Sequence, residues 1–257
     1  MKRPDLSKSQ LQAASLLVVL LLLLCWVSYY DRQKASAIPD FAGIADITIL
    51  KTRFFSYLRP LAEQANENIM TLREQVLSMK SRLAEGDSLN RSQQKKLTAL
   101  AEAYEVDLEN PQPGQLVTEL LHRIDSLPID LVLVQAATES GWGRSRFAQQ
   151  GNNFFGEWCY SPGCGLVPGS RAGDADHEVR RFDHPADSVA SYLHTINTHP
   201  AYKSLRGLRY QLRQAGKDIT GQILADTLIY YSERRQAYVD DIKTMLRQYH
   251  QLMDNEA

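Results

Sequence analysis

The sequence predicts an α+β protein that is predominantly helical, with one small β-lobe. Apolar residues recur at helical spacing over most of the chain beyond residue 48. One stretch, 157–182, lacks that period and is rich in glycine and proline, which is typical of turns and hairpins. Within it, residues 179–182 have the character of a strand. We therefore expect a helical body interrupted once by a small lobe.

The composition is that of a globular chain with a short membrane segment. Of 257 residues, 44% are hydrophobic and 23% are charged, and the net charge is −1. A chain of this length holds one large domain, or a medium-sized domain with an extension. Neither half is strongly basic, so we expect no nucleic acid as a partner. Nucleotide-binding glycine motifs and metal-ligand spacings are absent from the sequence, and we expect no cofactor.

Residues 1–34 predict a membrane anchor or a signal segment. The apolar run LLVVLLLLLCWV occupies 16–27 and follows three basic residues. Residues 11–30 are long enough to span a bilayer, for which about twenty residues suffice. Basic residues before the span keep the N-terminus in the cytoplasm. The rest of the chain would then be periplasmic and anchored in the inner membrane, or secreted if a signal peptide is cleaved after Ala37.

Residues 35–110 predict a linker and a helical hairpin. Apolar residues alternate at three- and four-residue steps between Ala62 and Leu83, over about three heptads. Gly86-Asp87-Ser88 interrupts the pattern, and a second helix is expected at 92–104. The hairpin is either a stalk, dimerisation coil or clamp, or else a helical layer packed on the domain that follows. The sequence leaves both open.

A catalytic domain is expected over 115–257, after the turn-forming segment Asn-Pro-Gln-Pro-Gly at 110–114. A helix at 116–124 comes first. The next run, 129–137, is apolar on nearly all sides, which predicts a buried helix. Pro128 suits its first turn, and Ser126 is a candidate cap. Glu139 would then lie in the last turn of this helix.

Glu139 is the candidate catalytic carboxyl group. Apolar neighbours and the negative end of the helix dipole both disfavour its charge, so both raise its pKa. A carboxylic acid that stays protonated near neutral pH is what a glycosidase uses as its general acid. The alternative is a helix-end glutamate that points into solvent. The Gly-Trp-Gly that follows, and the aromatic turn at 154–158, favour a functional role.

The lobe contains two cysteines, Cys159 and Cys164, which flank Tyr-Ser-Pro-Gly. Two cysteines alone make a poor zinc site. In an exported loop a small disulfide is the better interpretation, with two reduced thiols as the alternative. Helical patterns complete the chain at 185–196, 203–215, 221–230 and 233–251, with a turn at 198–202.

Two closely spaced motifs resemble the core of glycoside hydrolase family seventy-three, the peptidoglycan N-acetylglucosaminidases. They are Gln-Ala-Ala-Thr-Glu-Ser-Gly-Trp-Gly at 135–143 and Asn-Asn-Phe-Phe-Gly at 152–156. The resemblance, which runs from about residue 115 to the C-terminus, implies a lysozyme-like fold with the lobe across a cleft from the catalytic helix. It implies cleavage of the β-1,4 bond between N-acetylglucosamine and N-acetylmuramic acid, with Glu139 as general acid. Alternatives are a lytic transglycosylase or muramidase, or a non-catalytic, membrane-anchored peptidoglycan-binding scaffold.

The family resemblance also implies a second carboxyl group in the lobe, upstream of a phenylalanine that Phe182 resembles. Three acidic residues precede it closely, and a fourth follows it: Asp174, Asp176, Glu178 and Asp183. We choose Glu178 because it precedes the strand-like segment. Its alternative role is a surface ion pair with a neighbouring arginine, which would contribute little to stability.

Sugar binding needs flat apolar faces beside polar groups. The candidate substrate-binding residues are Trp142, Phe155, Trp158 and Tyr202. The resemblance favours Tyr202 most, although aromatic residues in such patterns are more often core. Asn153 is expected to hold its turn through backbone hydrogen bonds. Four histidines fall close together in the sequence, but their spacing fits no ligand pattern and we expect no metal site: His177, His184, His194 and His199.

Overall fold

The structure is a computed structural model that describes residues 38–169 and 176–254. The expected membrane segment at 1–34, the cleavage position at Ala37 and the candidate Asp174 lie outside the described residues. Among the helices of the described ranges, none has both the length and the apolar character needed to cross a membrane.

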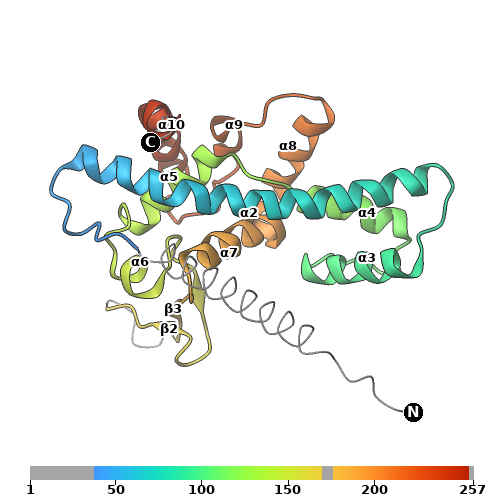
Figure 1. Cartoon of the computed structure of the whole chain (residues 1–257), viewed down its shortest axis with the longest axis horizontal. Helices are drawn as coiled ribbons and strands as arrows, with labels where there is room; N and C mark the ends of the chain where they lie inside the picture. The colour runs from blue at the N-terminus through green and yellow to red at the C-terminus, as the bar shows by residue number, and fades with distance from the viewer. Residues whose placement is uncertain (1–37, 170–175, 255–257) are drawn as a thin grey trace, which may run out of the picture. The chain divides into compact units, whose positions relative to one another are not determined.

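The described chain is predominantly helical with one small sheet (Figure 1). The first four helices are α2 (Ile47–Ala84), α3 (Arg91–Ala103), α4 (Pro113–Arg123) and α5 (Ile129–Ser140). The lobe region holds α6 (Arg146–Gly151), β1 (Trp158–Cys159), β2 (Gly165–Leu166) and β3 (Glu178–Arg180). The remaining elements are α7 (Pro185–Thr198), η1 (Pro200–Tyr202), α8 (Lys203–Gln214), α9 (Gly221–Ala225) and α10 (Gln236–Asp254). This arrangement is consistent with the expected α+β, lysozyme-like class.

Helix α2 is one continuous helix that lies along α4, α5, α7 and α10. Asp46 caps it by accepting hydrogen bonds from the amides of Thr48 and Ile49. Its apolar stripe, expected as a coiled-coil seam, is buried against these helices. The described residues from Asp40 onward form one compact unit. The helical layer packed on the domain is therefore the arrangement observed.

Helix α5 lies among α2, α9 and α10. Its residues from Leu131 to Ala137 are buried, as the apolar run predicted. The expected cap was wrong: Pro128 occupies the N-cap position, and no side chain caps the helix there, so Ser126 does not cap it. The body of α5 is therefore held in the core, and its last turn presents the half-buried Glu139.

The small lobe is a three-stranded antiparallel sheet in the order β1-β3-β2. Trp158 and Leu166 both pair with Val179 of the central strand β3. The predicted disulfide between Cys159 and Cys164 is present, with Cα atoms 6.2 Å apart. Gly165 is required in β2, because a Cβ at that position would lie 2.0 Å from the carbonyl oxygen of Val179. The disulfide and the glycine together allow this short sheet to close.

A buried ion cluster joins α2 and α8 to the loop between α4 and α5. Asp125 is only 1% exposed, and its carboxylate accepts two 2.7 Å hydrogen bonds from Arg213. Arg73 of α2 lies 3.5 Å from the same carboxylate and donates to the carbonyls of Leu121 and Ile124. Arg209 of α8 donates to four carbonyls of the same loop region and α4. Sequence periodicity did not predict this cluster.

Several element boundaries differ from expectation. Helix α6 was not expected. Helix α9 ends at Ala225, where turns replace the expected continuation to residue 230. Pro113 and Gly114 open α4 and do not form part of a linker, since proline is favoured in a first helical turn.

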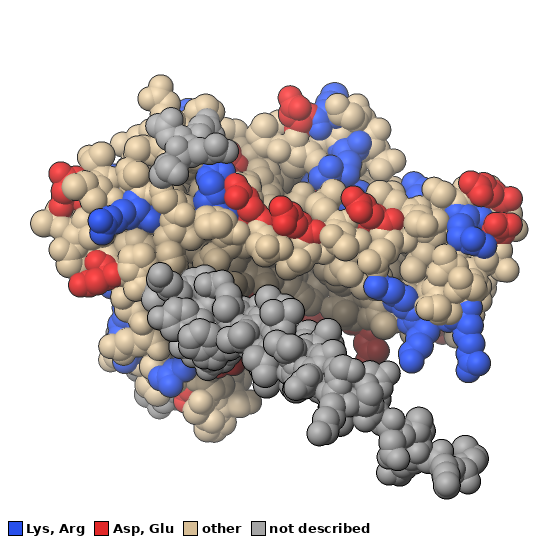
Figure 2. All heavy atoms as spheres, in the orientation of Figure 1, with Lys and Arg blue, Asp and Glu red and all other residues tan. Residues whose placement is uncertain are grey.

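Figure 2 shows acidic and basic side chains interspersed along the visible face of α2, so that part of the surface carries no broad field of one sign.

Candidate active site

Glu139 lies in the last turn of α5, where the chain leaves the helix through left-handed residues. Gly141, Trp142 and Gly143 all have positive φ, at 58°, 61° and 73°. Gly143 has no room for a side chain, because a Cβ there would lie 2.4 Å from the ring of Phe41. This turn stops the helix after Ser140, one residue beyond Glu139, and leaves the half-buried carboxyl group of Glu139 at the helix end.

The Glu139 carboxyl group has a raised pKa, as the sequence predicted. Burial is the largest cause, and it disfavours the charged form. Two neighbours act in the opposite direction: Tyr238 of α10 donates a hydrogen bond to the carboxylate, and the charge of Arg234 favours it. The net result is a carboxyl group that holds its proton to higher pH than an exposed glutamate does.

Four tyrosines surround this carboxyl group, and we call them the tyrosine cluster: Tyr192, Tyr202, Tyr231 and Tyr238. Their rings contact one another through Tyr231, which stacks on Tyr238 at 5.2 Å and lies 6.0 Å from Tyr202 and 6.4 Å from Tyr192. The Glu139 charge contributes to the raised pKa of every member. Since that effect decays with distance, all four phenols lie near the carboxylate.

Gln135, one helical turn before Glu139, orders the cluster. It is fully buried; its Oε1 accepts a hydrogen bond from Tyr192, and its Nε2 donates to Tyr238 at 3.1 Å. Residues four apart on a helix lie on the same face. Gln135 and Glu139 thus present one continuous polar edge of α5 to the tyrosines of α7 and α10.

A second carboxyl group, Glu157, lies close to the same tyrosines. Its charge, like that of Glu139, raises the pKa of Tyr192 and Tyr202. Its Oε2 accepts a 2.7 Å hydrogen bond from Ser191, and burial raises its pKa to about 7. Sequence reasoning did not single out Glu157. The available signal was its position, directly after the Asn-Phe-Phe-Gly turn that follows α6.

Asn153 holds that turn, as predicted. Its Nδ2 donates to the carbonyls of Glu157 and Arg180, and its Oδ1 accepts from the amides of Phe155 and Glu157. Asn153 is buried and satisfies four backbone groups at once. It thereby ties the turn that carries Glu157 to strand β3 of the lobe.

Glu178, the predicted second carboxyl group, lies in β3 and binds the disulfide loop. Its two oxygens accept hydrogen bonds from the amides of Gly163, at 3.0 Å, and Gly165, at 2.7 Å. The side chain is buried, so it is not the surface glutamate considered as its alternative. Asp176 and Asp183 are exposed. A catalytic role for Glu178 stays a prediction, and in this structure its carboxylate stabilises the loop.

The predicted sugar-binding aromatics occupy different environments. Tyr202 belongs to the tyrosine cluster. Trp158 is 56% exposed and stacks on His177 with ring centroids 4.0 Å apart. Phe155 is buried and stacks on Tyr192 at 4.0 Å. Trp142 packs edge-on against Phe54, Phe55 and Tyr249, which anchors the end of α5 to α2 and α10. The structure thus gives Phe155 and Trp142 packing contacts and leaves Trp158 accessible.

Three of the four histidines lie in α7 or cap it, the fourth precedes β3, and they have different partners. His194 stacks on Tyr104, His199 Nδ1 accepts from the amide of Ala201, and His184 precedes α7. Within the described ranges, one group of potential ligand atoms lies within 4.8 Å of one another, namely Cys159, Cys164 and Glu178. Its cysteines form the disulfide, so they offer no thiolates to a metal.

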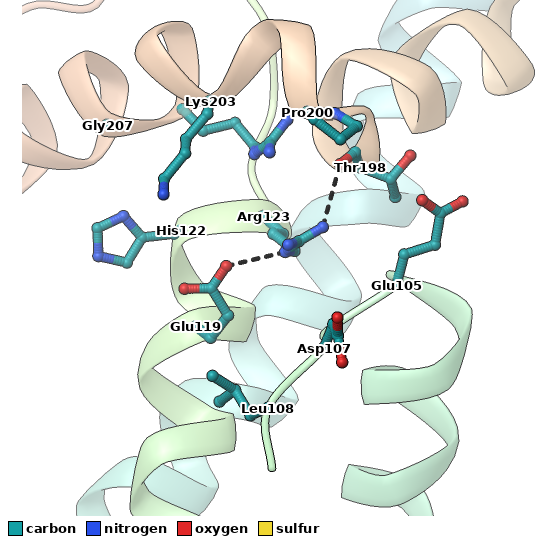
Figure 3. A pocket seen from close by; sticks show the side chains of 11 residues that line it. Glu105, Asp107, Leu108, Glu119, His122, Arg123, Thr198, Pro200, Lys203 and Gly207 are labelled. Carbon is teal, nitrogen blue, oxygen red and sulfur yellow. Dashed lines mark hydrogen bonds and ion pairs between the residues drawn. The ribbon is translucent and has the colours of Figure 1, made fainter. Parts of the chain in front are cut away.

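A pocket of about 550 Å³ lies away from these carboxyl groups, between the α3–α4 connection, α4, η1 and α8 (Figure 3). Figure 3 shows Lys203 and His122 on one side and Glu105 and Asp107 on another, with Arg123 bonded to Glu119 between them. None of the residues predicted from the sequence to be functional lines it. Helix η1 links the two regions, because Pro200 lines the pocket while Tyr202 joins the tyrosine cluster.

The chain is similar in sequence to known proteins over most of its length. Residues 114–251 match a family profile named glucosaminidase, described as mannosyl-glycoprotein endo-β-N-acetylglucosaminidase. The chain is also 30% identical to Protein bax of Escherichia coli (strain K12) over 211 residues, which cover 81% of this chain and 74% of the relative. No solved structure matches the chain. The matched range extends from α4 into α10 and includes Glu139, Glu157 and the tyrosine cluster.

Proposed function

Because the chain belongs to the glucosaminidase family, we propose that it is a peptidoglycan hydrolase with Glu139 as general acid. It cleaves the β-1,4 bond between N-acetylglucosamine and N-acetylmuramic acid. The observation that carries the proposal is the environment of Glu139. Its carboxyl group is half-buried at the end of a core helix, holds its proton to raised pH and borders a cluster of tyrosines.

The acid step follows from that environment. The protonated Glu139 carboxyl group donates its proton to the glycosidic oxygen as the bond from that oxygen to C1 breaks, which leaves an oxocarbenium-like sugar. A water molecule then bonds to C1 and gives its proton to a base. Glu139 ends the step as a carboxylate, which the hydrogen bond from Tyr238 stabilises. The tyrosine thus lowers the cost of the charge that the reaction creates.

Two aromatic residues support a sugar site beside this acid. Tyr202 lies near the carboxyl groups of Glu139 and Glu157. Trp158, which directly follows Glu157, offers an accessible ring on the lobe. Flat rings next to directional polar groups are the usual composition of a carbohydrate site. We propose Tyr202 and Trp158 as the sugar-contacting residues. For Glu178, the support for a catalytic role is its position in the lobe.

The proposed place of action is the periplasm. Residues 1–34, which lie outside the described residues, carry the basic and apolar pattern of an inner-membrane anchor. The disulfide between Cys159 and Cys164 supports an oxidising compartment. Localisation of a full-length fusion by cell fractionation tests this part: we expect the inner-membrane fraction, and a cytosolic location would contradict the proposal.

The central experiment compares muropeptide release by the wild type and by Glu139→Gln. The variant removes the transferable proton and keeps the size of the side chain, so we expect release to fall by about 10²- to 10⁴-fold. Glu74→Gln, at an exposed position of α2, is the matched control and should retain full activity. Equal release by the wild type and Glu139→Gln would refute the proposal, provided both proteins unfold at the same temperature.

Product chemistry separates the related enzymes. A new reducing N-acetylglucosamine end supports the glucosaminidase. A reducing N-acetylmuramic end would show a muramidase, and an anhydro-muramic end would show a lytic transglycosylase. Binding to sacculi without any release, by wild-type protein on several peptidoglycans, would support the scaffold alternative.

A further inference from the structure

Glu157 has a carboxyl oxygen for which the described protein provides no partner. Its Oε2 accepts the hydroxyl of Ser191 at 2.7 Å, while its Oε1 is buried and forms no hydrogen bond within the described residues. Buried polar atoms in native proteins are nearly always paired. An unpaired carboxyl oxygen therefore needs an explanation, and a substrate or an attacking water that binds there provides one.

The backbone around Glu157 is fixed by three hydrogen bonds. Its carbonyl accepts from Asn153 Nδ2 at 3.0 Å and from the amide of Arg180 at 2.8 Å, and its own amide donates to Asn153 Oδ1. The side chain is fixed at Oε2 by Ser191 of α7. A carboxyl group held by both its backbone and its side chain is preorganised, which is the arrangement of a functional group.

A continuous chain of contacts connects Glu157 to Glu139. Ser191, which binds Glu157, precedes Tyr192 on α7, and Tyr192 donates a hydrogen bond to Gln135. Gln135 lies one turn before Glu139 on α5 and donates to Tyr238, which in turn donates to Glu139. Both carboxyl groups thus connect to the same tyrosine cluster, Glu139 from α5 and Glu157 from the turn before β1.

We propose that Glu157, and not the lobe residue Glu178, supplies the second carboxyl group of the glycosidase site. The inference rests on the proposed function of Glu139. When the glycosidic bond breaks, Glu139 gives its proton to the leaving oxygen. The ionised Glu157 accepts a proton from the water whose oxygen bonds to C1, so the reaction consumes one water and moves one proton between the two groups. Glu178 cannot take this part without giving up its two loop amides.

The charged and titratable groups that face Glu157 agree with that role. They come from three elements: Arg180 of β3, Tyr192 of α7 and Tyr202 of η1. Burial raises the pKa of Glu157 to about 7, while Ser191 and Arg180 act to lower it. A general base is most effective when its pKa lies near the working pH.

The first test is Glu157→Gln, compared with Glu178→Gln and the exposed control Glu74→Gln. We expect Glu157→Gln to lower kcat by about 10²- to 10³-fold with a nearly unchanged KM. The bell-shaped pH profile of kcat/KM should reduce to a single ionisation. The inference is overturned if Glu157→Gln, folded, keeps activity within about 3-fold of the wild type and keeps both limbs. It is equally overturned if only Glu178→Gln, folded, loses turnover.

Ser191→Ala provides a second variant with a more specific result, because Ser191 is a positioning residue whose hydroxyl donates to Glu157. Removing its hydrogen bond raises the pKa of Glu157. The limb of the pH profile that Glu157→Gln abolishes should then move to higher pH. A merely structural serine would lower activity at all pH values without moving a limb, and that result would contradict the inference.

A carboxyl ¹³C NMR titration of the full chain distinguishes this inference from the proposed function. We expect Glu157 to titrate well above an ordinary glutamate in the wild type and to shift to still higher pH in Ser191→Ala. Titration of Glu157 at the ordinary value, unaffected by Ser191→Ala, overturns the inference whatever the activity. A raised, serine-dependent titration in a protein that hydrolyses no peptidoglycan would refute the proposed function instead.

Discussion

Tyr238 donates a hydrogen bond to Glu139 and, through the same hydroxyl, accepts one from Gln135. The contact joins α10, near the end of the chain, to α5. A single phenol therefore favours the charged form of Glu139, which is the form left after proton donation in the proposed function, and also orders the polar edge of α5.

Tyr238→Phe should alter the pH dependence of activity. The hydrogen bond favours the charged form of Glu139, so its loss raises the pKa of that carboxyl group further. A general acid works in its protonated form, so the alkaline limb of kcat/KM should move to higher pH. We expect kcat to fall by about 5- to 10-fold, as the loss of about 1 kcal/mol of charge stabilisation implies. An unmoved limb in a folded variant would contradict the assignment of Glu139 as the acid.

Glu157 should make the protein less stable as pH rises. Its pKa is raised from 4.5 to about 7 in the folded state. The contribution of Glu157 to the free energy of unfolding is therefore fully present below pH 4.5 and is lost as pH rises from 4.5 through 7. The loss approaches about 3 kcal/mol for a shift of this size. Urea unfolding at pH 4.5 and pH 8 checks this.

In the same measurement, Glu157→Gln lacks the ionisation and serves as the comparison. From pH 4.5 to pH 8, the free energy of unfolding should therefore fall less in Glu157→Gln than in the wild type. An identical pH dependence in both proteins would show that Glu157 ionises normally in the folded state.

Asp125→Ala should be strongly destabilising. The substitution leaves Arg73, Arg209 and Arg213 without the carboxylate that they share in the core. Breaking a buried ion pair by removing one partner costs about 3–5 kcal/mol, because the remaining charges stay buried. Asp87→Ala is the matched control, since its pair with Arg82 is exposed on both sides and should contribute less than about 1 kcal/mol. Equal unfolding free energies for the two variants would refute a central role for the cluster.

Trp158→Ala should weaken substrate binding without unfolding the lobe. The ring is accessible and its loss opens no core cavity. We expect KM for glycan strands to rise by about 5- to 30-fold, which corresponds to the loss of about 1–2 kcal/mol. Tyr160→Ala, at another exposed aromatic position of the lobe, is the control and should change KM little. A normal KM for Trp158→Ala would remove this residue from the sugar site.

Local patterns predicted the parts of the molecule that depend on near neighbours along the chain. The buried helix that bears Glu139, the turn held by Asn153 and the disulfide of the lobe follow from periodicity, turn chemistry and spacing. Each is determined within about ten residues of sequence, where helical and turn preferences act.

The tertiary structure determined which groups these helices, turns and side chains contact. Glu178 and Glu157 are both lobe-side glutamates in the sequence, and nothing local distinguishes them. The fold directs one carboxylate to the amides of Gly163 and Gly165 and buries the other beside Ser191 and the tyrosines. For α2, the sequence likewise left open a coiled coil or a helical layer, because an apolar stripe predicts burial and does not identify the surface that covers it.

By itself, the sequence determined the helical class, the position of the candidate acid at the end of a buried helix, and the family. Only the tertiary structure decided which groups surround that acid: the phenol of Tyr238, the ordering amide of Gln135 and the carboxyl group of Glu157. The physical reason is that burial, hydrogen bonding and charge at a site depend on residues far apart in sequence. Gln135 and Tyr238, for example, meet across 103 positions of the chain.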